Sequence, residues 1–410
     1  MKLRRRVRHA VLTATIAAAV VPAGLVLAGT AHAAPAAKAG AHGFIKPPCA
    51  TASSGHMRCF FRYRPQVAVN QAMAAGQASK PHGLTPAELR SAYKLPNRST
   101  SKQTVAISIP LHTPDLASFL ATFRAQFGLP ACTVASGCFR QVNQQGKATP
   151  AEPSALGSGW DLEATLDVSM VSVSCPTCKI LVVEAKSPTA ASLGASEVTA
   201  ARLGAQVISN SYGAFERDVP RGFMKDWDLR GHTVVASSGD FGFAAPEFPA
   251  DIGSVTAVGG TRLTKDPGSR RGWKETAWVL SGSGCSTRIV KPAWQHDTKC
   301  KGRTVADVSA AATFIPVFSS TYGGWVTVDG TSASAPLIAG IYALAGNGAT
   351  VTPAHLYRNT RSFFDVTKGN NAADSGFTAL QDCDNDYICV AKKGYDAVTG
   401  LGTPDGIGGF

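Results

Sequence analysis

The tract VDGTSASAP, from Val328 to Pro336, places serines in front of the apolar stretch LIAGIYALAG. Small residues can open a buried helix, and they can also present a nucleophilic serine at a helix N-terminus, where N–H groups favour negative charge. A nucleophilic serine needs a base, a group that orients the base, and donors for the oxyanion. If Ser332 performs chemistry, the rest of the chain must supply these groups. Pro336 is expected in the first helical turn, which tolerates proline, and Ser334 is expected to pack or cap.

Histidine does not supply the base in any familiar way. Seven of the nine histidines follow residue 33, and none lies in the His-Gly-Thr-x-x-Ala-Gly motif of subtilisin-type peptidases. Two interpretations remain open: Ser332 is structural, or its base is a carboxylate.

The segment WDLEATLDV offers two carboxylates. Glu163 and Asp167 are four residues apart, so a helix places both on one face. They border an apolar stripe that includes Leu162 and Leu166. Like charges at this spacing cost a few tenths of a kcal/mol on an exposed helix and more when partly buried. A catalytic pair and a solvated acidic edge both fit this segment taken alone.

Asp240, in ASSGDFG, follows the short apolar run HTVVASSG. An aspartate flanked by glycines at a strand end can simply form a turn, and taken alone this is the favoured interpretation.

Short Val- and Ile-rich runs alternate with segments of helical periodicity from about residue 104. This pattern predicts an α/β fold, a parallel sheet with helices on both faces, in a single large domain. Polar groups at the carboxyl ends of such strands gather at one edge, where sites of this class form. The predicted strands lie at 104–109, 178–185, 205–213, 232–240 and 254–260, and the predicted helices at 115–128, 161–173 and 190–205.

Together these features resemble the sedolisin family of serine-carboxyl peptidases, which have the subtilisin fold with acids in place of histidine. The resemblance extends from Gly83 to Phe410. It rests on the order and spacing of GLTPAELRSAY, ExxLD, GAQVISNSYG, ASSGDFG, VTAVGGT, ETAW, KPAWQ, RTVADVSA, GTSASAP and GYDAVTGLGTP.

The resemblance implies roles for four residues. Ser332 would be the nucleophile, Glu163 the general base and then acid, Asp167 the residue that orients Glu163, and Asp240 the oxyanion donor. A carboxylate can act as a base in acid solution, where histidine is protonated. Asp240 must be protonated to donate, which needs a raised pKa. An endopeptidase that cleaves proteins and peptides at acidic pH is expected.

The resemblance also implies a Ca²⁺ site in FFDVTKG and KKGYDAVTG. Its ligands would be the carboxylates of Asp365 and Asp396 and the backbone carbonyls of Val366, Lys392 and Gly394, and oxygen ligands suit Ca²⁺.

Three positions depart from the family pattern. Ile109 stands where an acid is usual, Phe241 where a small or polar residue is usual, and Asp329 where Gly or Ser is usual. A non-catalytic secreted binding protein with the same fold is therefore the alternative function.

Residues 1–33 combine a basic start, an apolar core and AHA at 31–33, which predicts a secretory signal peptide. Without its five basic residues the formal charge falls from +13 to +8. No basic cluster is interleaved with aromatics, so nucleic-acid binding is not expected. We expect a secreted, extracellular monomer with no membrane association after signal removal.

Ten cysteines in an exported chain predict disulfides. Pairing of neighbours predicts five local bridges: Cys49–Cys59, Cys132–Cys138, Cys175–Cys178, Cys285–Cys300 and Cys383–Cys389. A redox or zinc role for CPTC is the alternative. Residues 34–82 are expected to form a linker or short pro-segment, with order beginning at the capping box Thr85-Pro86-x-Glu88. Residues 83–410 are expected to form the sedolisin-like peptidase domain.

Overall fold

The computed structural model describes residues 43–51, 55–77, 79–97, 100–151, 153–372, 383 and 386–410. The predicted signal peptide lies outside these residues. Among the residues described, we find no helix with the length and apolar character to span a bilayer. The α-helices are α1 Val67–Ala74, α2 Pro86–Ala92, α3 Leu116–Gln126, α4 Trp160–Ser174, α5 Ala190–Arg202, α6 Thr331–Ala345 and α7 Pro353–Arg358.

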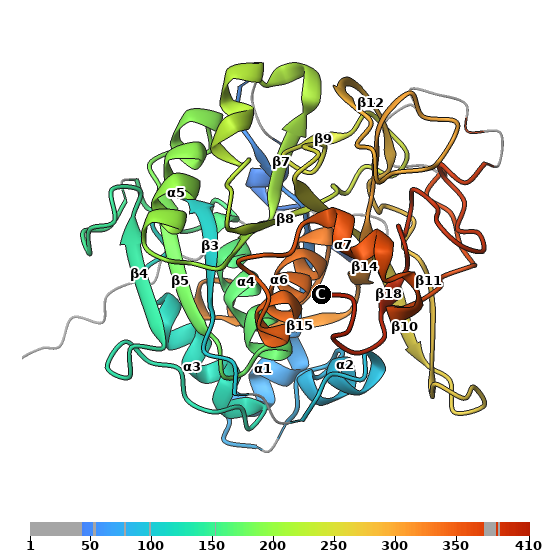
Figure 1. Cartoon of the computed structure of the whole chain (residues 1–410). Helices are drawn as coiled ribbons and strands as arrows, with labels where there is room; N and C mark the ends of the chain where they lie inside the picture. The colour runs from blue at the N-terminus through green and yellow to red at the C-terminus, as the bar shows by residue number, and fades with distance from the viewer. Residues whose placement is uncertain are drawn as a thin grey trace, which may run out of the picture. The chain divides into compact units, whose positions relative to one another are not determined.

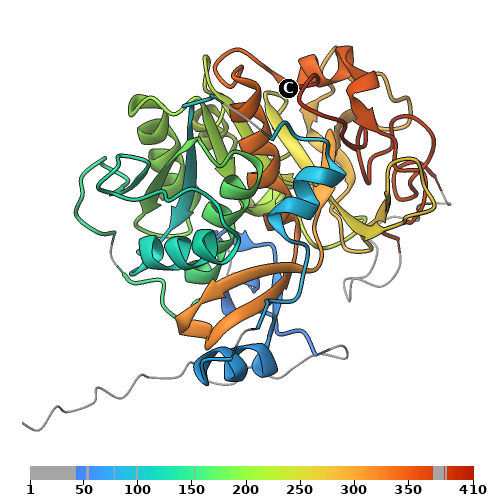
Figure 2. The ribbon, with the colours of Figure 1, turned by 90° about the horizontal axis from the view of Figure 1, so that it is seen from below.

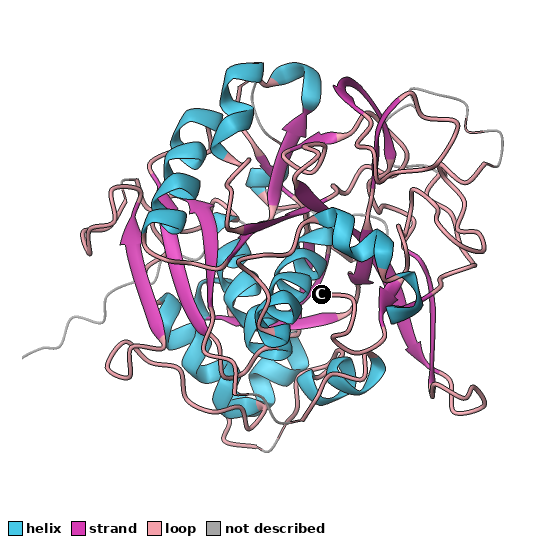
Figure 3. Cartoon of the chain, in the orientation of Figure 1, coloured by secondary structure: helices cyan, strands magenta, loops and turns pink. Residues whose placement is uncertain are grey.

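The strands form one large sheet and several small ones (Figure 3). They are β1 Arg58–Cys59, β2 Arg62–Pro65, β3 Thr104–Pro110, β4 Phe139–Asn143, β5 Lys179–Ala185, β6 Val207–Asn210, β7 Tyr212–Phe215, β8 Thr233–Ser237, β9 Glu247–Phe248, β10 Val255–Lys265, β11 Trp273–Ala277, β12 Gly284–Val290, β13 Gly302–Val305, β14 Val308–Ala311, β15 Ile315–Ser319, β16 Gly324–Asp329, β17 Phe363–Phe364 and β18 Thr403–Pro404.

The central sheet has eight strands in the order β11-β10-β8-β6-β3-β5-β4, with β14 also paired to β10. Its neighbours run parallel except for the edge strand β11, which is antiparallel to β10. The predicted parallel sheet is confirmed, and each predicted strand overlaps an observed one. The strands β4, β11 and β14 of the central sheet and the pairings of the small sheets were not predicted.

Helices cover both faces of this sheet (Figure 1). Alternate side chains of β3 divide between two cores: Val105 and Ile107 belong to the larger one, which includes residues of α4 and α6, and Ala106 packs with Ala200 of α5 in a smaller one. This alternation is the two-sided burial that a continuous apolar strand requires.

Ordered structure begins before Gly83. β1 pairs with β7, and β2 pairs with β16, the strand that leads into α6. Figure 2 shows α1 beside the orange β15–β16 hairpin, against which it packs. The expectation that order begins at the Thr85 capping box is wrong for residues 43–51 and 55–77, because strands of two to four residues gain stability from pairing and leave little periodic signal. A pro-segment role stays a prediction. The capping box itself is confirmed: Thr85 Oγ1 accepts from the Glu88 N–H, and Glu88 Oε2 accepts from the Thr85 N–H.

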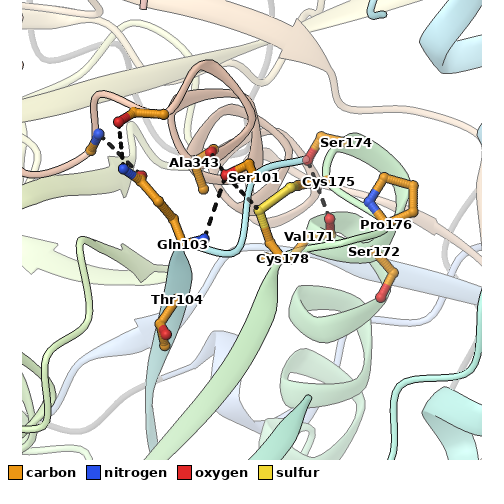
Figure 4. The surroundings of a disulfide bond; sticks show 12 residues. Ser101, Gln103, Thr104, Val171, Ser172, Ser174, Cys175, Pro176, Cys178 and Ala343 are labelled. Atoms are coloured by element: carbon orange, nitrogen blue, oxygen red, sulfur yellow. Dashed lines mark hydrogen bonds between the residues drawn. A yellow bond between two sulfur atoms is a disulfide. The ribbon is translucent and has the colours of Figure 1, made fainter. Parts of the chain in front are cut away.

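All five predicted disulfides are present. Figure 4 shows the bridge of CPTC, Cys175–Cys178, directly after α4. Beside it Ser101 donates to the Ala343 carbonyl near the end of α6, at 2.5 Å. This cysteine pair therefore ties the chain between α4 and β5 rather than holding a metal.

Candidate active site

The two carboxylates of α4 lie inside the protein. Every residue of this helix is buried, and Glu163 and Asp167 are both 0% exposed. The helix tolerates complete burial because its hydroxyls, such as that of Thr165, donate to carbonyls one turn back. A solvated acidic edge is thereby excluded, and the acids lie deeper than the border position expected from sequence.

Ser332 approaches Glu163 from α6, which packs against α4. Its hydroxyl donates to Glu163 Oε2 at 2.9 Å and lies 3.5 Å from the Ser211 carbonyl. Ser334, by contrast, donates to the Ala310 carbonyl at 3.0 Å. Of the two serines in the tract, Ser332 is the one bonded to an acid.

Pro336 lies in the second turn of α6, as its sixth residue, so its expected place in the first turn is wrong. Its missing N–H is the group that would otherwise bond to the Ser332 carbonyl. The Ser211 hydroxyl lies 3.3 Å from this carbonyl and 2.6 Å from Asp167 Oδ1. It has one proton and can donate to only one of the two oxygens at a time. Ser211 therefore links Asp167 to the backbone of Ser332, although sequence reasoning did not single it out.

Burial raises the pKa of Glu163 well above its ordinary value, and the Asp167 carboxylate raises it further, while the Ser332 hydroxyl lowers it. Burial also raises the pKa of Asp167, partly offset by Ser211. Glu163 Oε1 and Asp167 Oδ2 have no hydrogen-bond partner among the described residues. Two like charges so close cannot both ionise readily, so the pair favours a state that retains a proton.

Asp240 follows β8 and reaches the start of α6. Its Oδ1 accepts from the N–H of Thr331 at 2.9 Å and from the hydroxyl at 2.8 Å. Burial raises the pKa of Asp240 to about 8, against the lowering effect of Thr331. The residue is thus more than a turn former, because it is a half-buried acid on the cleft wall that keeps its proton through the acid range.

Part of the N-terminal segment occupies the space above Ser332. The Ser332 N–H donates to the Phe60 carbonyl at 3.2 Å, and the Phe60 N–H donates to Ser332 Oγ at 3.3 Å. Position 330 requires glycine, because a Cβ there would lie 2.1 Å from the Phe60 carbonyl oxygen. A cleft of about 1120 Å³ continues beside this segment, lined in part by Phe61, Asp240 and Trp278.

The three departures from the family pattern have structural roles. Ile109 is buried in β3. Phe241 lies edge-on to Phe60 with ring centroids 6.3 Å apart. Asp329 accepts a 2.7 Å hydrogen bond from the N–H of Phe314, a residue with φ of 66°, and lies opposite Arg62 in the β16–β2 pair.

The residues predicted to bind calcium come from two adjoining segments. The Gly394 N–H donates to Asp365 Oδ2 at 2.9 Å, and the Lys392 N–H donates to Asp396 Oδ2 at 3.0 Å. Val366 and Asp396 are buried. Across the described ranges, no three His, Cys, Asp or Glu side chains come together as a metal-holding group. The donors here are two carboxylates with backbone carbonyls nearby in the chain, an all-oxygen set compatible with Ca²⁺.

Comparison with known proteins agrees with this geometry. A family model described as the subtilase family matches residues 156–360, which include Glu163, Asp240 and Ser332. Kumamolisin from a Bacillus species (strain MN-32) is 29% identical over 389 residues, a match that covers 85% of this chain and 67% of kumamolisin. The structure of Pseudomonas sedolisin, described as a serine-carboxyl proteinase complexed with two molecules of pseudo-iodotyrostatin, shares the fold with a TM-score of 0.64 at 22% identity and covers 80% of this chain and 96% of that one. The chain belongs to the subtilase family, and within it to the sedolisins.

The sedolisin resemblance and the subtilisin-like fold predicted from sequence are thus confirmed. Other relatives carry a different name: a probable tripeptidyl-peptidase SED3 from Trichophyton verrucosum is 29% identical over 248 residues, which cover 48% of this chain and 40% of that protein. The match therefore covers less than half of the length of such relatives. Membership of the family supports a serine-type peptidase.

The segment that reaches Ser332 was not recognised from sequence as part of the site. A usable signal lies in MRCFFRYRP, residues 57–65, where Arg58, Arg62 and Arg64 alternate with Cys59, Phe61 and Tyr63 apart from Phe60. Such period-two alternation is typical of a strand. The run lies between Ala- and Gly-rich stretches, and these made the whole region look like a linker.

Proposed function

We propose that the chain is a secreted serine-type endopeptidase that hydrolyses peptide bonds of proteins in acid solution. The observation that carries this proposal is the 2.9 Å hydrogen bond from the Ser332 hydroxyl to Glu163 Oε2 in a buried site. Ser332 is the nucleophile, Glu163 the general base and then the acid for the leaving amine, and Asp167 the residue that orients Glu163. A protonated Asp240 donates a hydrogen bond to the oxyanion.

The proposed reaction uses each group where it lies. As Ser332 Oγ attacks the carbonyl carbon, its proton moves to Glu163, which later protonates the leaving nitrogen. The Ser332 N–H, at the N-terminus of α6, faces the carbonyl oxygen, and a protonated Asp240 adds a second donor. The Asp167 carboxylate raises the pKa of Glu163 through its charge, which favours a single proton held by the pair.

Acid conditions suit this set of groups. A carboxylate with an ordinary pKa near 4 is ionised where histidine is protonated, whereas Asp240, with a pKa of about 8, stays neutral there. Burial and the Asp167 carboxylate raise the pKa of Glu163, whereas the Ser332 hydroxyl and the Phe60 backbone lower it. We expect the pKa to fall when water enters the cleft, because desolvation is the main cause of the rise.

Endopeptidase action is supported by the path of the N-terminal segment. The chain passes Ser332 with ordered residues on both sides of Phe60, from the His56–Thr189 bridge to β2. A site that releases tripeptides would instead close three residues before the cleaved bond. An N-terminally blocked peptide of ten residues distinguishes these outcomes, because only an endopeptidase cleaves it internally, as mass spectrometry would report.

The decisive test assays purified protein on denatured casein from pH 3 to pH 9. Ser332→Ala and Glu163→Gln should each lose about 10⁴-fold or more in kcat. Ser334→Ala is the matched control, since the Ser334 hydroxyl bonds to Ala310 and not to an acid; it should keep most of the activity. A wild-type protein inert at every pH, even after displacement of the N-terminal segment, would favour the alternative of a non-catalytic binding protein.

We propose in addition that Asp365 and Asp396, with the carbonyls of Val366, Lys392 and Gly394, hold a Ca²⁺ ion. The hydrogen bond from Gly394 to Asp365 supports this, because it brings the two segments together. Calcium bound there would tie β17 to the C-terminal segment and stabilise the fold. Chelation should lower the Tm, and added Ca²⁺ but not Mg²⁺ should restore it; a Tm unchanged by chelation would contradict the site.

Secretion is supported by the five disulfides, which form and persist in oxidising compartments. We propose that residues 1–33 are removed on export. Expression with a C-terminal tag and N-terminal sequencing of protein from the medium should find a start at or after Ala34.

A further inference from the structure

We propose that the cleft beside Ser332 binds acidic peptide side chains, so that the enzyme prefers substrates with Asp or Glu among the few residues that follow the cleaved bond. This rests on the proposed function, since it takes Ser332 as the nucleophile. We call this surface the basic cleft, because four cationic side chains line it: Lys46, Arg62, Arg64 and Arg262.

The basic cleft carries an excess of positive charge in acid solution. The described residues that line it include only two acids, Asp240 and Asp329. Burial raises the pKa of Asp240 to about 8, so this carboxyl is neutral at acidic pH. Burial also raises the pKa of Asp329, although three nearby arginines lower it. Four cations therefore face at most one ionised carboxylate.

These cations have no internal counter-charge. Within the described part of the chain, no carboxylate lies at ion-pair distance from any of the four. Arg58, only four residues before Arg62, does have such a partner, Glu247 at 2.7 Å. The buried Nε of Arg62 has no hydrogen-bond partner among the described residues. Like charges gathered in a cleft raise the local concentration of anions, so this surface favours a ligand that brings negative charge.

Aromatic rings hold two of the arginines in place. The Arg62 guanidinium lies 5.4 Å from the ring centroid of Trp278 and 5.6 Å from that of Phe44. The Arg64 guanidinium lies 4.9 Å from the Phe44 centroid. A guanidinium stacked on a ring still presents N–H groups at its edge, and their planar arrangement matches a carboxylate. The stacking therefore limits the side-chain freedom that would be lost when an acidic residue binds.

The position of the basic cleft assigns it to residues after the cleaved bond. The Phe60 carbonyl faces the Ser332 N–H, and the next residue, Phe61, lines the cleft. A substrate carbonyl that replaces the Phe60 carbonyl would direct its following residues the same way. The ladder along β16 is already filled by Arg62–Pro65 of β2, so the open volume of about 1120 Å³ is left for them. Small-molecule sites measure roughly 300–1,000 Å³, so this cleft has room for a short stretch of peptide.

Arg262 and Asp329 should act in opposite directions on this preference. Arg262 is exposed on β10, a strand of the central sheet, so it stays in place when Phe60 moves away from Ser332. The Asp329 carboxylate interacts electrostatically with Arg262 and so competes with a substrate acid for it. Its Oδ1 accepts from the Phe314 N–H, and an asparagine at this position would keep that acceptor while losing the charge.

The test uses the full chain and one parent peptide, N-terminally blocked, that the wild-type protein cleaves at a bond located by mass spectrometry. Glu, Gln or Lys is placed in turn at each of the four positions after that bond. The measurement is kcat/KM at pH 5, where a glutamate side chain is mostly ionised. We expect Glu to exceed Gln by about 2- to 5-fold at one position or more, the value of an exposed charge pair, with Lys the poorest. High salt should reduce this preference.

Four variants locate the effect. Arg262→Gln should remove most of the preference for Glu, Arg262→Glu should make Lys the better residue at the same position, and Asp329→Asn should strengthen the preference for Glu. Arg140→Gln is the matched control, since Arg140 is exposed on β4 at the other edge of the central sheet; it removes the same charge and should change nothing. If a variant at position 262 does not fold, Arg64→Gln tests the same surface, because Arg64 is exposed as well.

The other outcomes separate this inference from the proposed function. Equal rates for Glu, Gln and Lys at every position overturn this inference and leave the proposed function standing, as does a preference that Arg262→Glu and Arg140→Gln alter alike. Cleavage of no peptide by well-folded wild type, even after displacement of the N-terminal segment, overturns the proposed function. Fluorescence anisotropy with the Ser332→Ala protein then reports on the cleft alone. Tighter binding of labelled tetraglutamate than of tetralysine supports an acidic ligand, and equal binding overturns it. Tight binding of heparin without discrimination between Glu and Gln peptides marks a polysaccharide site and also overturns this inference.

Discussion

Replacement of Asp240 by asparagine should separate hydrogen-bond donation from proton loss. Thr331 donates twice to Asp240 Oδ1, so these two bonds would orient the asparagine with its carbonyl oxygen toward Thr331. Its NH₂ group would then occupy the position of Oδ2. An amide donates at any pH, whereas the wild-type carboxyl donates only below its pKa of about 8.

The expected magnitude follows from that pKa. The carboxyl keeps roughly nine-tenths of its protons at pH 7, half at pH 8 and one-tenth at pH 9. The ratio of kcat/KM for Asp240→Asn over wild type should therefore rise about tenfold between pH 7 and pH 9. Asp240→Ala, which has no donor, should lose about 10²- to 10³-fold in the acid range.

The assay measures kcat/KM on an N-terminally blocked fluorogenic peptide that the wild-type protein cleaves. Initial rates are taken within minutes of each pH shift, and circular dichroism confirms that both variants stay folded. Glu163 and Asp167 titrate in both proteins, so the ratio removes their effect except for the rise in the Glu163 pKa that an ionised Asp240 causes in the wild type. A ratio that stays flat from pH 7 to pH 9, or an Asn variant as inactive as the Ala variant, would refute donation by Asp240.

Three further results are expected. Burial raises the pKa of Glu197 and of Asp251 to about 8. The contribution of each to the free energy of unfolding is therefore full below about pH 4 and falls by about 1.4 kcal/mol per pH unit as pH rises towards 8. Thermal unfolding should show a Tm that falls over this range, and a Tm that rises would contradict it. Ser211→Ala should lower kcat by about tenfold at little change in KM and shift the pH profile, whereas a merely structural residue would change only the Tm. Gly340→Ala would place a Cβ 2.0 Å from the Ser174 hydroxyl, so the contact between α6 and α4 should weaken and urea unfolding should report a loss of about 1–3 kcal/mol.

Local sequence was sufficient for much of the fold. The runs that became β3, β5, β8 and β10 are short, rich in Val and Ile and bounded by turn residues, and this pattern depends only on near neighbours in the chain. The five disulfides were predictable because each links neighbouring cysteines. β1 and β2 escaped prediction because their stability comes from distant partners, β7 and β16.

The four proposed reactive residues could be named from sequence because the order and spacing of the motifs around them resemble those of the sedolisins. What they do in space was decided by tertiary structure. Complete burial of α4 turned an ambiguous acidic edge into a carboxyl pair with raised pKa values, since desolvation depends on packing from every side. The link from Ser211 to Ser332, and the presence of Phe60 above Ser332, join residues more than one hundred positions apart. Periodicity in a sequence reports on neighbours within a few residues, so only the folded chain could reveal a segment lodged in its own site.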